Sequence, residues 1–261
     1  MTVRVGARQL EDLRRSLTRR DLDVLASVDQ YRLLTTTQLQ RLHFADHRSD
    51  ASAARVCRRV LARLTDHRVL VRLRRRVGGV RAGSAGHIHA VGPLGHRLLD
   101  PKRQKRWREP GTVFVDHTLA IAELAISTLE HAAADQHVLV VETEPSCWRT
   151  FTHRHTPMTV KPDLALVTAT RAHEWRWFIE VDLGTESGPA IGRKCRIYDT
   201  YWRSGVEQHR HDVYPRVLWV ASSRERAEFM SLVIAASGAE SSLFAVTTTD
   251  SAVDIVFGGE S

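Results

Sequence analysis

The sequence is poor in cysteine, and its cysteines are far apart. Three are present among the 261 residues, at Cys57, Cys147 and Cys195. An odd number at such wide spacing forms neither a disulfide framework nor the paired pattern of a zinc site. We therefore expect a protein of the reducing cytoplasm, where free thiols persist.

Long apolar runs are also missing. No run approaches the roughly 20 apolar residues that a membrane-spanning helix needs, and the N-terminal stretch MTVRVGARQLEDLRR lacks the apolar core of a signal peptide. The chain has no internal repeat and no low-complexity tract. With 43% hydrophobic and 26% charged residues it has an ordinary globular composition and enough length for two domains. We expect no membrane partner.

Lysine is almost absent. The chain has four lysines against 34 arginines, so arginine is its default basic residue. A lysine at an inward-facing position therefore suggests that an arginine could not perform the same role at that position.

Acidic residues are scarce in the first part of the chain. Residues 1–110 contain 25 Lys and Arg against 10 Asp and Glu, a balance of +15, whereas the remaining 151 residues contain 13 and 20, a balance of −7. A strongly basic half is typical of a module that contacts the phosphate backbone of DNA. Any DNA contact in the acidic half should be local.

The first part of the chain shows three helical segments. Thr18 and Asp21 form a capping-box pattern ahead of the first helix, whose leucines and valines recur at helical spacing. A short second helix should begin near residues 35–37. A third should start after Ser49, a plausible N-cap, and run to about Asp66.

A basic hairpin and a further helix follow these three helices. Residues 69–91 alternate apolar and basic side chains and contain glycine-rich turns, which predicts a hairpin. Residues 93–99 (PLGHRLL) fit a closing helix. This order is that of a winged helix-turn-helix, in which one helix enters the major groove and the hairpin contacts the backbone or minor groove. We assign residues 1–100 to this domain and residues 101–112 to a basic linker.

Arginines cluster on the third helix and on the hairpin. A single arginine there would be interpreted as part of a solvated face, but eight together favour double-stranded DNA. Winged-helix proteins often bind palindromes as dimers, so we also expect a homodimer. The predicted DNA-binding residues are Arg55, Arg58, Arg59, Arg63, Arg72, Arg74, Arg75 and Arg76.

Residues 113–261 alternate helical and strand-like segments. The predicted order is a helix bearing Val115, Leu119, Ala122, Ile126 and Leu129 on one face, three strands (HVLVVETE, TVKPDLALVTA and EWRWFIEVDL), a helix over about 188–204, and a strand, helix and strand beyond it. Such an order predicts a mixed sheet flanked by helices. Together with the N-terminal domain, the predicted class is α/β (α+β).

Carboxylates lie inside two of these apolar strands. Asp163 belongs to the second strand, and Glu180 and Asp182 belong to the third. Burying an unpaired charge is costly, so acids in such apolar strands indicate a functional role. Carboxylates on adjacent strands are suitable ligands for Mg²⁺ or Mn²⁺. Such an ion can activate water and neutralise charge on a phosphate. The alternatives are a turn cap for Asp163 and a structural pair with an arginine such as Arg193 for Glu180 or Asp182.

Two histidine pairs complete the candidate residues. His153 with His155 and His209 with His211 have the HxH spacing of metal ligands. Neither pair has an evident third ligand, so we interpret both as surface residues.

Residues 113–250, in the order αβββαβ, resemble the PD-(D/E)XK nuclease superfamily. The pair at 162–163 matches the PD element and Glu180 matches the second acid. The superfamily often adds an acid from the first helix, for which Glu123 is the candidate. Its lysine normally follows the second acid by two residues, where this chain has Asp182. In some members the lysine lies on the next helix, as Lys194 does here.

The resemblance thus implies a set of site residues. Lys194 shares a helix face with aromatic residues, and its alternative interpretation is a salt bridge to Glu180 or Glu186. The implied catalytic residues are Asp163, Glu180 and Lys194, and the implied Mg²⁺ or Mn²⁺ ligands are Glu123, Asp163, Glu180 and Asp182.

The whole chain is similar to the replication-relaxation family of plasmids and other mobile elements. The similarity covers residues 18–250 and rests on the winged-helix region, HTLAIAEL, KPDLALV, FIEVDLGTES, IGRKCRIYDTYW and RVLWVASSRERAEFM in this order. It implies a role in plasmid replication or mobilisation, with plasmid replication or transfer proteins as partners.

Two hypotheses follow for the function. The first is a DNA-binding, metal-dependent endodeoxyribonuclease. The second is a non-catalytic DNA-binding regulator, or an accessory factor of replication or of the relaxosome with a degenerate nuclease fold, which the acid at position 182 favours. A nuclease that needs groups supplied by a partner protein is a third. Metal-dependent cleavage discriminates the first from the second.

Overall fold

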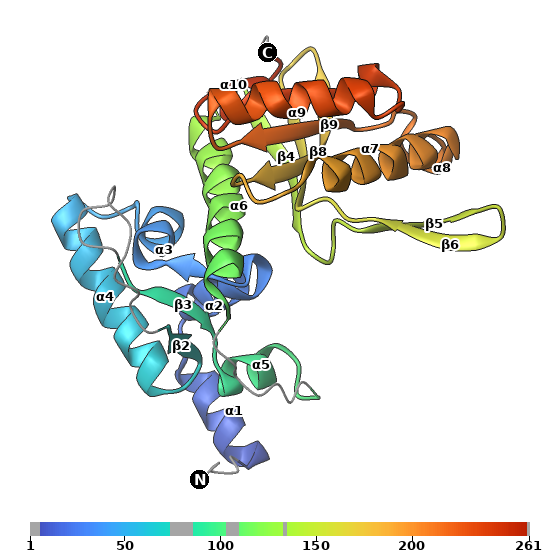
Figure 1. The fold of residues 1–261 in the computed structure, drawn as a ribbon. Coiled ribbons are helices and arrows are strands. Elements are labelled where there is room, and N and C mark those ends of the chain that lie inside the picture. The colour runs from blue at the N-terminus through green and yellow to red at the C-terminus, as the bar shows by residue number, and fades with distance from the viewer. Residues whose placement is uncertain (1–5, 74–85, 103–109, 133–134, 260–261) are drawn as a thin grey trace. The chain divides into compact units, whose positions relative to one another are not determined.

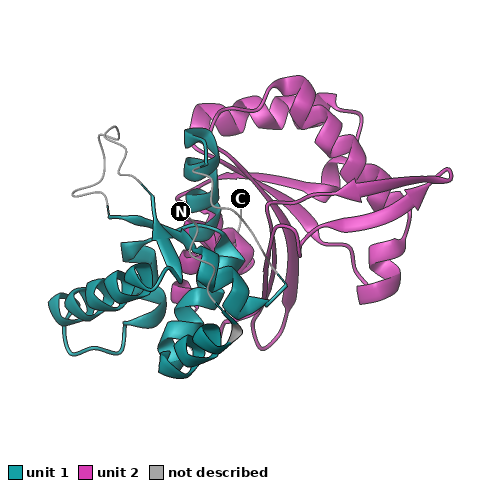
Figure 2. Ribbon diagram, turned by 90° about the horizontal axis from the view of Figure 1, so that it is seen from below, with its two compact units in different colours: residues 1–122 teal, residues 123–261 magenta. Residues whose placement is uncertain are grey.

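The computed structural model describes residues 6–73, 86–102, 110–132 and 135–259 (Figure 1). The chain divides into two compact units, residues 1–122 (unit 1) and 123–261 (unit 2) (Figure 2). Both helices and a mixed sheet are present, which confirms the predicted α/β class.

Unit 1 is built from short helices and a small antiparallel sheet. Its strands lie in the order β1-β3-β2. The elements are α1 (Ala7–Ser16), α2 (Arg19–Tyr31), β1 (Leu34–Thr35), α3 (Thr36–His43), α4 (Asp50–Asp66), β2 (Leu70–Arg72), β3 (Ile88–Val91), α5 (Pro93–Leu99) and the start of α6 (Thr112–His131).

Local capping signals set the helix boundaries in unit 1. The Thr18 side chain accepts the backbone N–H of Asp21, whose carboxylate accepts the Thr18 N–H, so the predicted capping box is confirmed. Ser49 caps α4, which ends at Asp66 as predicted. The predicted hairpin strands pair antiparallel as β2 and β3. Helix α1 was not predicted.

Unit 2 is a five-stranded mixed sheet with helices on both faces. The strand order is β10-β9-β8-β7-β4, in which β4, β7 and β8 run antiparallel and β8, β9 and β10 run parallel. Besides the end of α6, the elements are β4 (His137–Thr143), β5 (Arg149–His153), β6 (Thr156–Val160), β7 (Leu164–Ala169), β8 (Glu174–Asp182), α7 (Gly188–Arg203), α8 (Val206–His211), β9 (Arg216–Ala221), α9 (Arg224–Ala236), a 3-10 turn (Ser241–Leu243), β10 (Phe244–Thr248) and α10 (Ala252–Val256).

The two faces of β8 meet different helices. Tyr198 of α7 donates a hydrogen bond to Glu180 on one face, and Trp177 on the other donates to the Val256 carbonyl in α10. Between the sheet, α7 and α9 lies a core that includes Phe178 and Trp219. The acids of β8 on the α7 face are therefore held against a packed core.

The segment TVKPDLALVTA, predicted to be one strand, is divided, so that prediction was wrong. Strand β6 ends at Val160 and β7 begins at Leu164. Pro162 lies between them, and proline cannot donate to a sheet ladder. Strands β5 and β6 instead form a separate two-stranded hairpin, which was not predicted.

Helix α6 has a less regular buried face than predicted. Val115, Ala122 and Ile126 are buried and Leu119 is partly buried, but Leu129 is 40% exposed in the last turns. By length and composition alone, α6 is the one described helix that could cross a membrane, with a mean hydropathy of 1.3. We interpret it as a core helix, because Val115 packs in the core of unit 1.

Candidate functional site

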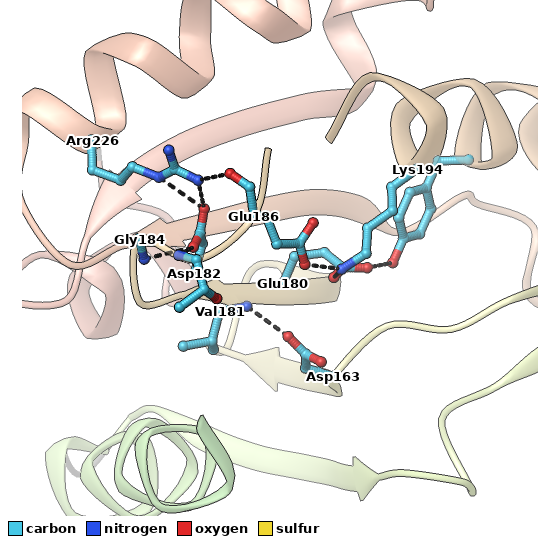
Figure 3. A network of polar contacts seen from close by, with 10 residues as sticks. Asp163, Glu180, Val181, Asp182, Gly184, Glu186, Lys194 and Arg226 are labelled. Atoms are coloured by element: carbon cyan, nitrogen blue, oxygen red, sulfur yellow. Dashed lines mark hydrogen bonds and ion pairs between the residues drawn. The ribbon is translucent and has the colours of Figure 1, made fainter. Parts of the chain in front are cut away.

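Asp163 is fixed to β8 by both its backbone and its side chain. It lies just before β7 and is 7% exposed. Its N–H donates to the Ile179 carbonyl at 3.0 Å, and its Oδ2 accepts the Val181 N–H at 2.8 Å. Although Asp163 lies outside the strand, these bonds hold its carboxylate beside Glu180 (Figure 3).

Glu180 is buried under α7 and has partners on both oxygens. Its Oε2 lies 2.7 Å from Lys194 Nζ, and its Oε1 accepts from the Tyr198 hydroxyl at 2.6 Å. Lys194 and Tyr198 are four residues apart on α7, so both side chains point to the same acid. Lys194 Nζ also lies 2.5 Å from Glu186 Oε1, which makes it a bridge between two carboxylates (Figure 3).

The environment of Glu180 opposes its negative charge. Burial raises the pKa of Glu180, and the nearby Asp163 raises it further, while Lys194 and Tyr198 partly offset this. Burial alone would lower the pKa of Lys194, but its ion pairs with Glu180 and Glu186 outweigh burial and raise it. The site therefore holds two neighbouring acids that gain from a nearby positive charge.

Asp182 organises the loop that follows β8. Its Oδ1 accepts the backbone N–H groups of Gly184 at 2.7 Å and Thr185 at 3.1 Å. Its Oδ2 accepts Arg226 Nε at 2.9 Å, and the same guanidinium donates to the Glu186 carbonyl. Asp182 is 1% exposed, so these bonds fix the loop that presents Glu186 to the lysine.

The other predicted ligands are less closely grouped. Glu123 is half-buried on α6 and accepts a hydrogen bond from Ser127 at 3.3 Å. Within the described ranges, no three His, Cys, Asp or Glu side chains are close enough together to hold a metal ion. The structure thus brings Asp163, Glu180 and Lys194 together, while Asp182 has its own arginine partner.

The arginines of α4 differ in their surroundings. Arg55, Arg58 and Arg59 are exposed, but Arg63 Nη2 lies 2.6 and 2.8 Å from the two carboxylate oxygens of buried Asp21. On the hairpin, Arg72 is exposed. Positions 74–76 lie outside the described residues.

A comparison of the sequence with protein families gives a match to replication-relaxation, over residues 25–217. The chain belongs to the replication-relaxation family. Membership indicates a role in plasmid replication or mobilisation. No curated protein and no solved structure matches the chain.

The match to the replication-relaxation family runs from α2 into β9. The matched residues include the arginines of α4 and also the cluster of Asp163, Glu180 and Lys194. Arg226, the partner of Asp182, lies beyond its end, in α9. No local pattern near position 182 pointed to that arginine, which is 44 residues away in sequence.

Proposed function

We propose that this replication-relaxation protein binds double-stranded DNA through a winged-helix domain at residues 1–100 and cleaves DNA with residues 113–261. The order α2, α3, α4, β2, β3 supports the first part, because it is the order of a winged helix. Exposed Arg55, Arg58 and Arg59 on α4 provide charges that suit phosphate contacts.

The observation that carries the nuclease proposal is the cluster of Asp163, Glu180 and Lys194. Lys194 contacts Glu180 at 2.7 Å, and Asp163 is bonded to the backbone of the residue that follows Glu180. The order α6-β4-β7-β8-α7-β9, interrupted by one hairpin and by α8, also has the pattern of the PD-(D/E)XK superfamily. Fold similarity alone does not establish activity, so the proposal depends on this cluster of side chains.

A Mg²⁺ or Mn²⁺ ion fits this donor set. Mg²⁺ commonly takes one or two protein carboxylates together with waters and substrate phosphates, and Asp163 and Glu180 are two acids whose charges oppose each other. When bound, the ion supplies Lewis-acid activation of water and neutralises charge on the phosphate. Glu123 and Asp182 stay predictions as further ligands, and we give Asp182 a positioning role because of its bonds to Arg226 and the loop.

Lys194 has two tasks in the proposed enzyme. Its ammonium group neutralises Glu180 in the buried site, and it can orient a water or stabilise negative charge that develops on the phosphate. Tyr198 holds the other oxygen of Glu180 and so fixes the direction of that carboxylate.

The second candidate is a non-catalytic DNA-binding regulator or an accessory factor of replication or transfer complexes. It is favoured by the ion pairs that engage Glu180 with Lys194 and Asp182 with Arg226. In this case the acids stabilise the fold, and unit 2 serves as a surface for plasmid replication or transfer proteins or for a second copy of the chain.

The decisive experiment incubates the protein with supercoiled and linear plasmid DNA in Mg²⁺, Mn²⁺ or EDTA. The Asp163→Ala/Glu180→Ala double variant and the Arg55→Ala/Arg59→Ala double variant are tested beside it. We expect metal-dependent cleavage that the acid variant loses while its DNA binding persists, and weaker binding in the arginine variant. Tight binding without cleavage in either metal would favour the accessory role.

A further inference from the structure

The hairpin of β5 and β6 is an insertion in the sheet of unit 2. It leaves the sheet after β4, returns just before β7, and forms a two-stranded ribbon of its own. Figure 1 shows the ribbon extending away from the five-stranded sheet. With five residues in each strand, the ribbon is about 16 Å long at the usual rise per residue.

The ribbon is fixed to the core from its base to its central pair, Phe151 and Met158. Phe151 is 5% exposed, and its ring lies 4.9 Å from that of Tyr201 in α7. Cys147 precedes the first strand of the ribbon and Pro162 follows the second, and the Cys147 Sγ donates a hydrogen bond to the Pro162 carbonyl at 2.9 Å. Arg149 forms an ion pair within unit 2, since its Nη2 lies 2.6 Å from Glu142 Oε2. The ribbon therefore has a fixed direction, and its return strand leads directly to Asp163.

The tip of the ribbon is exposed and has an unusual turn. Thr152, Arg154, His155 and Thr156 are exposed, and the two central turn residues have positive φ angles, 48° at Arg154 and 64° at His155. A two-residue hairpin turn of this kind normally carries Asn-Gly, because those residues adopt positive φ easily. Histidine is among the residues enriched at positive φ, but arginine is uncommon there, so the choice of Arg154 at the exposed tip is not explained by conformational preference.

The charge of the ribbon differs from that of its unit. Residues 148–161 contain no Asp or Glu, and besides Arg149, which is paired with Glu142, they contain Arg154, Lys161 and two histidines. Residues 123–261 as a whole contain 13 Lys and Arg against 19 Asp and Glu. If unit 2 approaches DNA, its general charge repels the backbone, and this acid-free ribbon is a local exception.

One face of the ribbon also offers neutral donors. Because side chains alternate along a strand, Thr150 and Thr152 share a face with Thr159 of the partner strand, and the hydroxyls of Thr150 and Thr159 lie 3.2 Å apart. Threonine hydroxyls and arginine are among the groups that contact DNA phosphates. The side chains of this face and of the tip thus match the chemistry of a phosphate backbone.

We propose that the β5–β6 ribbon is a second DNA-contacting element, which places Arg154 and His155, at its tip, on the phosphate backbone of duplex DNA. A two-stranded ribbon is narrow enough to lie along or within the major groove. This inference rests on the proposed DNA-binding function and adds a contact from unit 2.

The test measures binding of the full-length protein to a labelled DNA duplex by fluorescence anisotropy at several salt concentrations. The variant Arg154→Asn/His155→Gly removes both side chains and installs the turn sequence that this backbone prefers, so it should keep or raise the melting temperature. We expect a 3- to 10-fold loss of affinity, as an order-of-magnitude estimate, and a salt dependence smaller by about one phosphate contact. The control Arg171→Asn removes an exposed arginine from the turn at the far end of β7. It should change neither the affinity for the duplex nor its salt dependence.

The outcomes separate the two proposals. Wild-type protein that does not bind the duplex contradicts the proposed function itself. Binding by wild type with unchanged affinity and salt dependence in the ribbon variant overturns the ribbon proposal alone. A direct check places a thiol-linked iron chelate at Thr152→Cys, since all three native cysteines are buried. Localised cleavage of bound duplex supports the contact, and its absence on bound duplex contradicts it.

Discussion

Each unit of the molecule contains a buried acid, and the pKa values of these two acids shift in opposite directions. Asp21 in unit 1 and Glu180 in unit 2 are 0% and 1% exposed, and each pairs with a basic residue. Burial alone would raise the pKa of Asp21, but hydrogen bonds from Arg63 and Thr18 outweigh it and lower the pKa. The pKa of Glu180 is raised by burial despite its partners, and Asp163 adds to the rise.

The contrast separates a structural acid from a candidate functional one. The surroundings of Asp21 favour its charge, as expected for a residue that caps a helix and holds an arginine. Those of Glu180 oppose its charge and include a second acid, which is typical of functional sites. Variants of the two acids should therefore behave differently.

The largest expected effect comes from removing the cation at Glu180. Lys194→Met should lower the free energy of unfolding by about 3 kcal/mol, because a buried acid loses its partner. Urea denaturation measures this loss. Adding Glu180→Gln to the same chain should restore much of the stability, and a Lys194→Met variant as stable as wild type would mean that Glu180 needs no counter-ion.

A smaller loss is expected at the structural acid. Asp21→Ala removes the carboxylate half of the capping box and the partner of Arg63, and should lower the free energy of unfolding by about 2 kcal/mol. Arg63→Ala should cost less, because the bonds from the Thr18 backbone N–H and hydroxyl to the Asp21 carboxylate remain. Equal losses in the two variants, measured by urea denaturation, would contradict this order.

The pH dependence of stability should have opposite signs for the two acids. The stability that Glu180 contributes is present below its unfolded pKa, near 4.5. It is lost as the pH rises through the higher folded pKa, by about 1.4 kcal/mol for each tenfold change in the dissociation constant on folding. The contribution of Asp21 is present above its unfolded pKa, near 3.8, and is lost as the pH falls through its lower folded pKa.

These signs are checked by unfolding the two amide variants across the pH range. Glu180→Gln should gain stability relative to wild type as the pH rises above 4.5. Asp21→Asn should be less stable than wild type above pH 3.8, and this difference in the free energy of unfolding should shrink as the pH falls below 3.8. Parallel curves for wild type and Glu180→Gln would show that the pKa of Glu180 does not change on folding.

The smallest expected effect is that of a divalent ion. At about ten times its Kd, Mg²⁺ should stabilise the folded state by about 1.4 kcal/mol, and raise the melting temperature of wild type in calorimetry. Asp163→Ala/Glu180→Ala should not respond, whereas Asp21→Asn should respond as wild type does. An equal response in all three proteins would place the ion elsewhere.

Features with local causes could be predicted closely from the sequence. The capping residues Thr18 and Ser49 identify the starts of α2 and α4, because a cap depends on residues only a few positions away. In unit 2, apolar periodicity identifies the strands β4, β8, β9 and β10 and the helices α6, α7 and α9. The β5–β6 hairpin could not be predicted in this way, since its turn residues, Arg154 and His155, are not turn formers.

The residues of the candidate site were proposed from the sequence, but only some of the contacts among them were. Alternation along β8 put Glu180 on one face with Phe178 and Asp182. A salt bridge from Lys194 to Glu180 or Glu186 was one of the alternatives, and Lys194 contacts both acids. The ion pair of Asp182 with Arg226 joins residues 44 positions apart. Nothing local specifies such a pair, because it depends on how α9 packs against the sheet.

In the proposed metal site, Lys194 would also make folding independent of the supply of metal. Sites made only of acids or thiolates often cannot form until an ion arrives, and such proteins unfold when a chelator removes it. Here the chain carries its own cation to Glu180, at 2.7 Å. If the site binds Mg²⁺ or Mn²⁺ as proposed, a newly made chain can complete its fold in a cell short of divalent ions, and loading with metal is a later, reversible step.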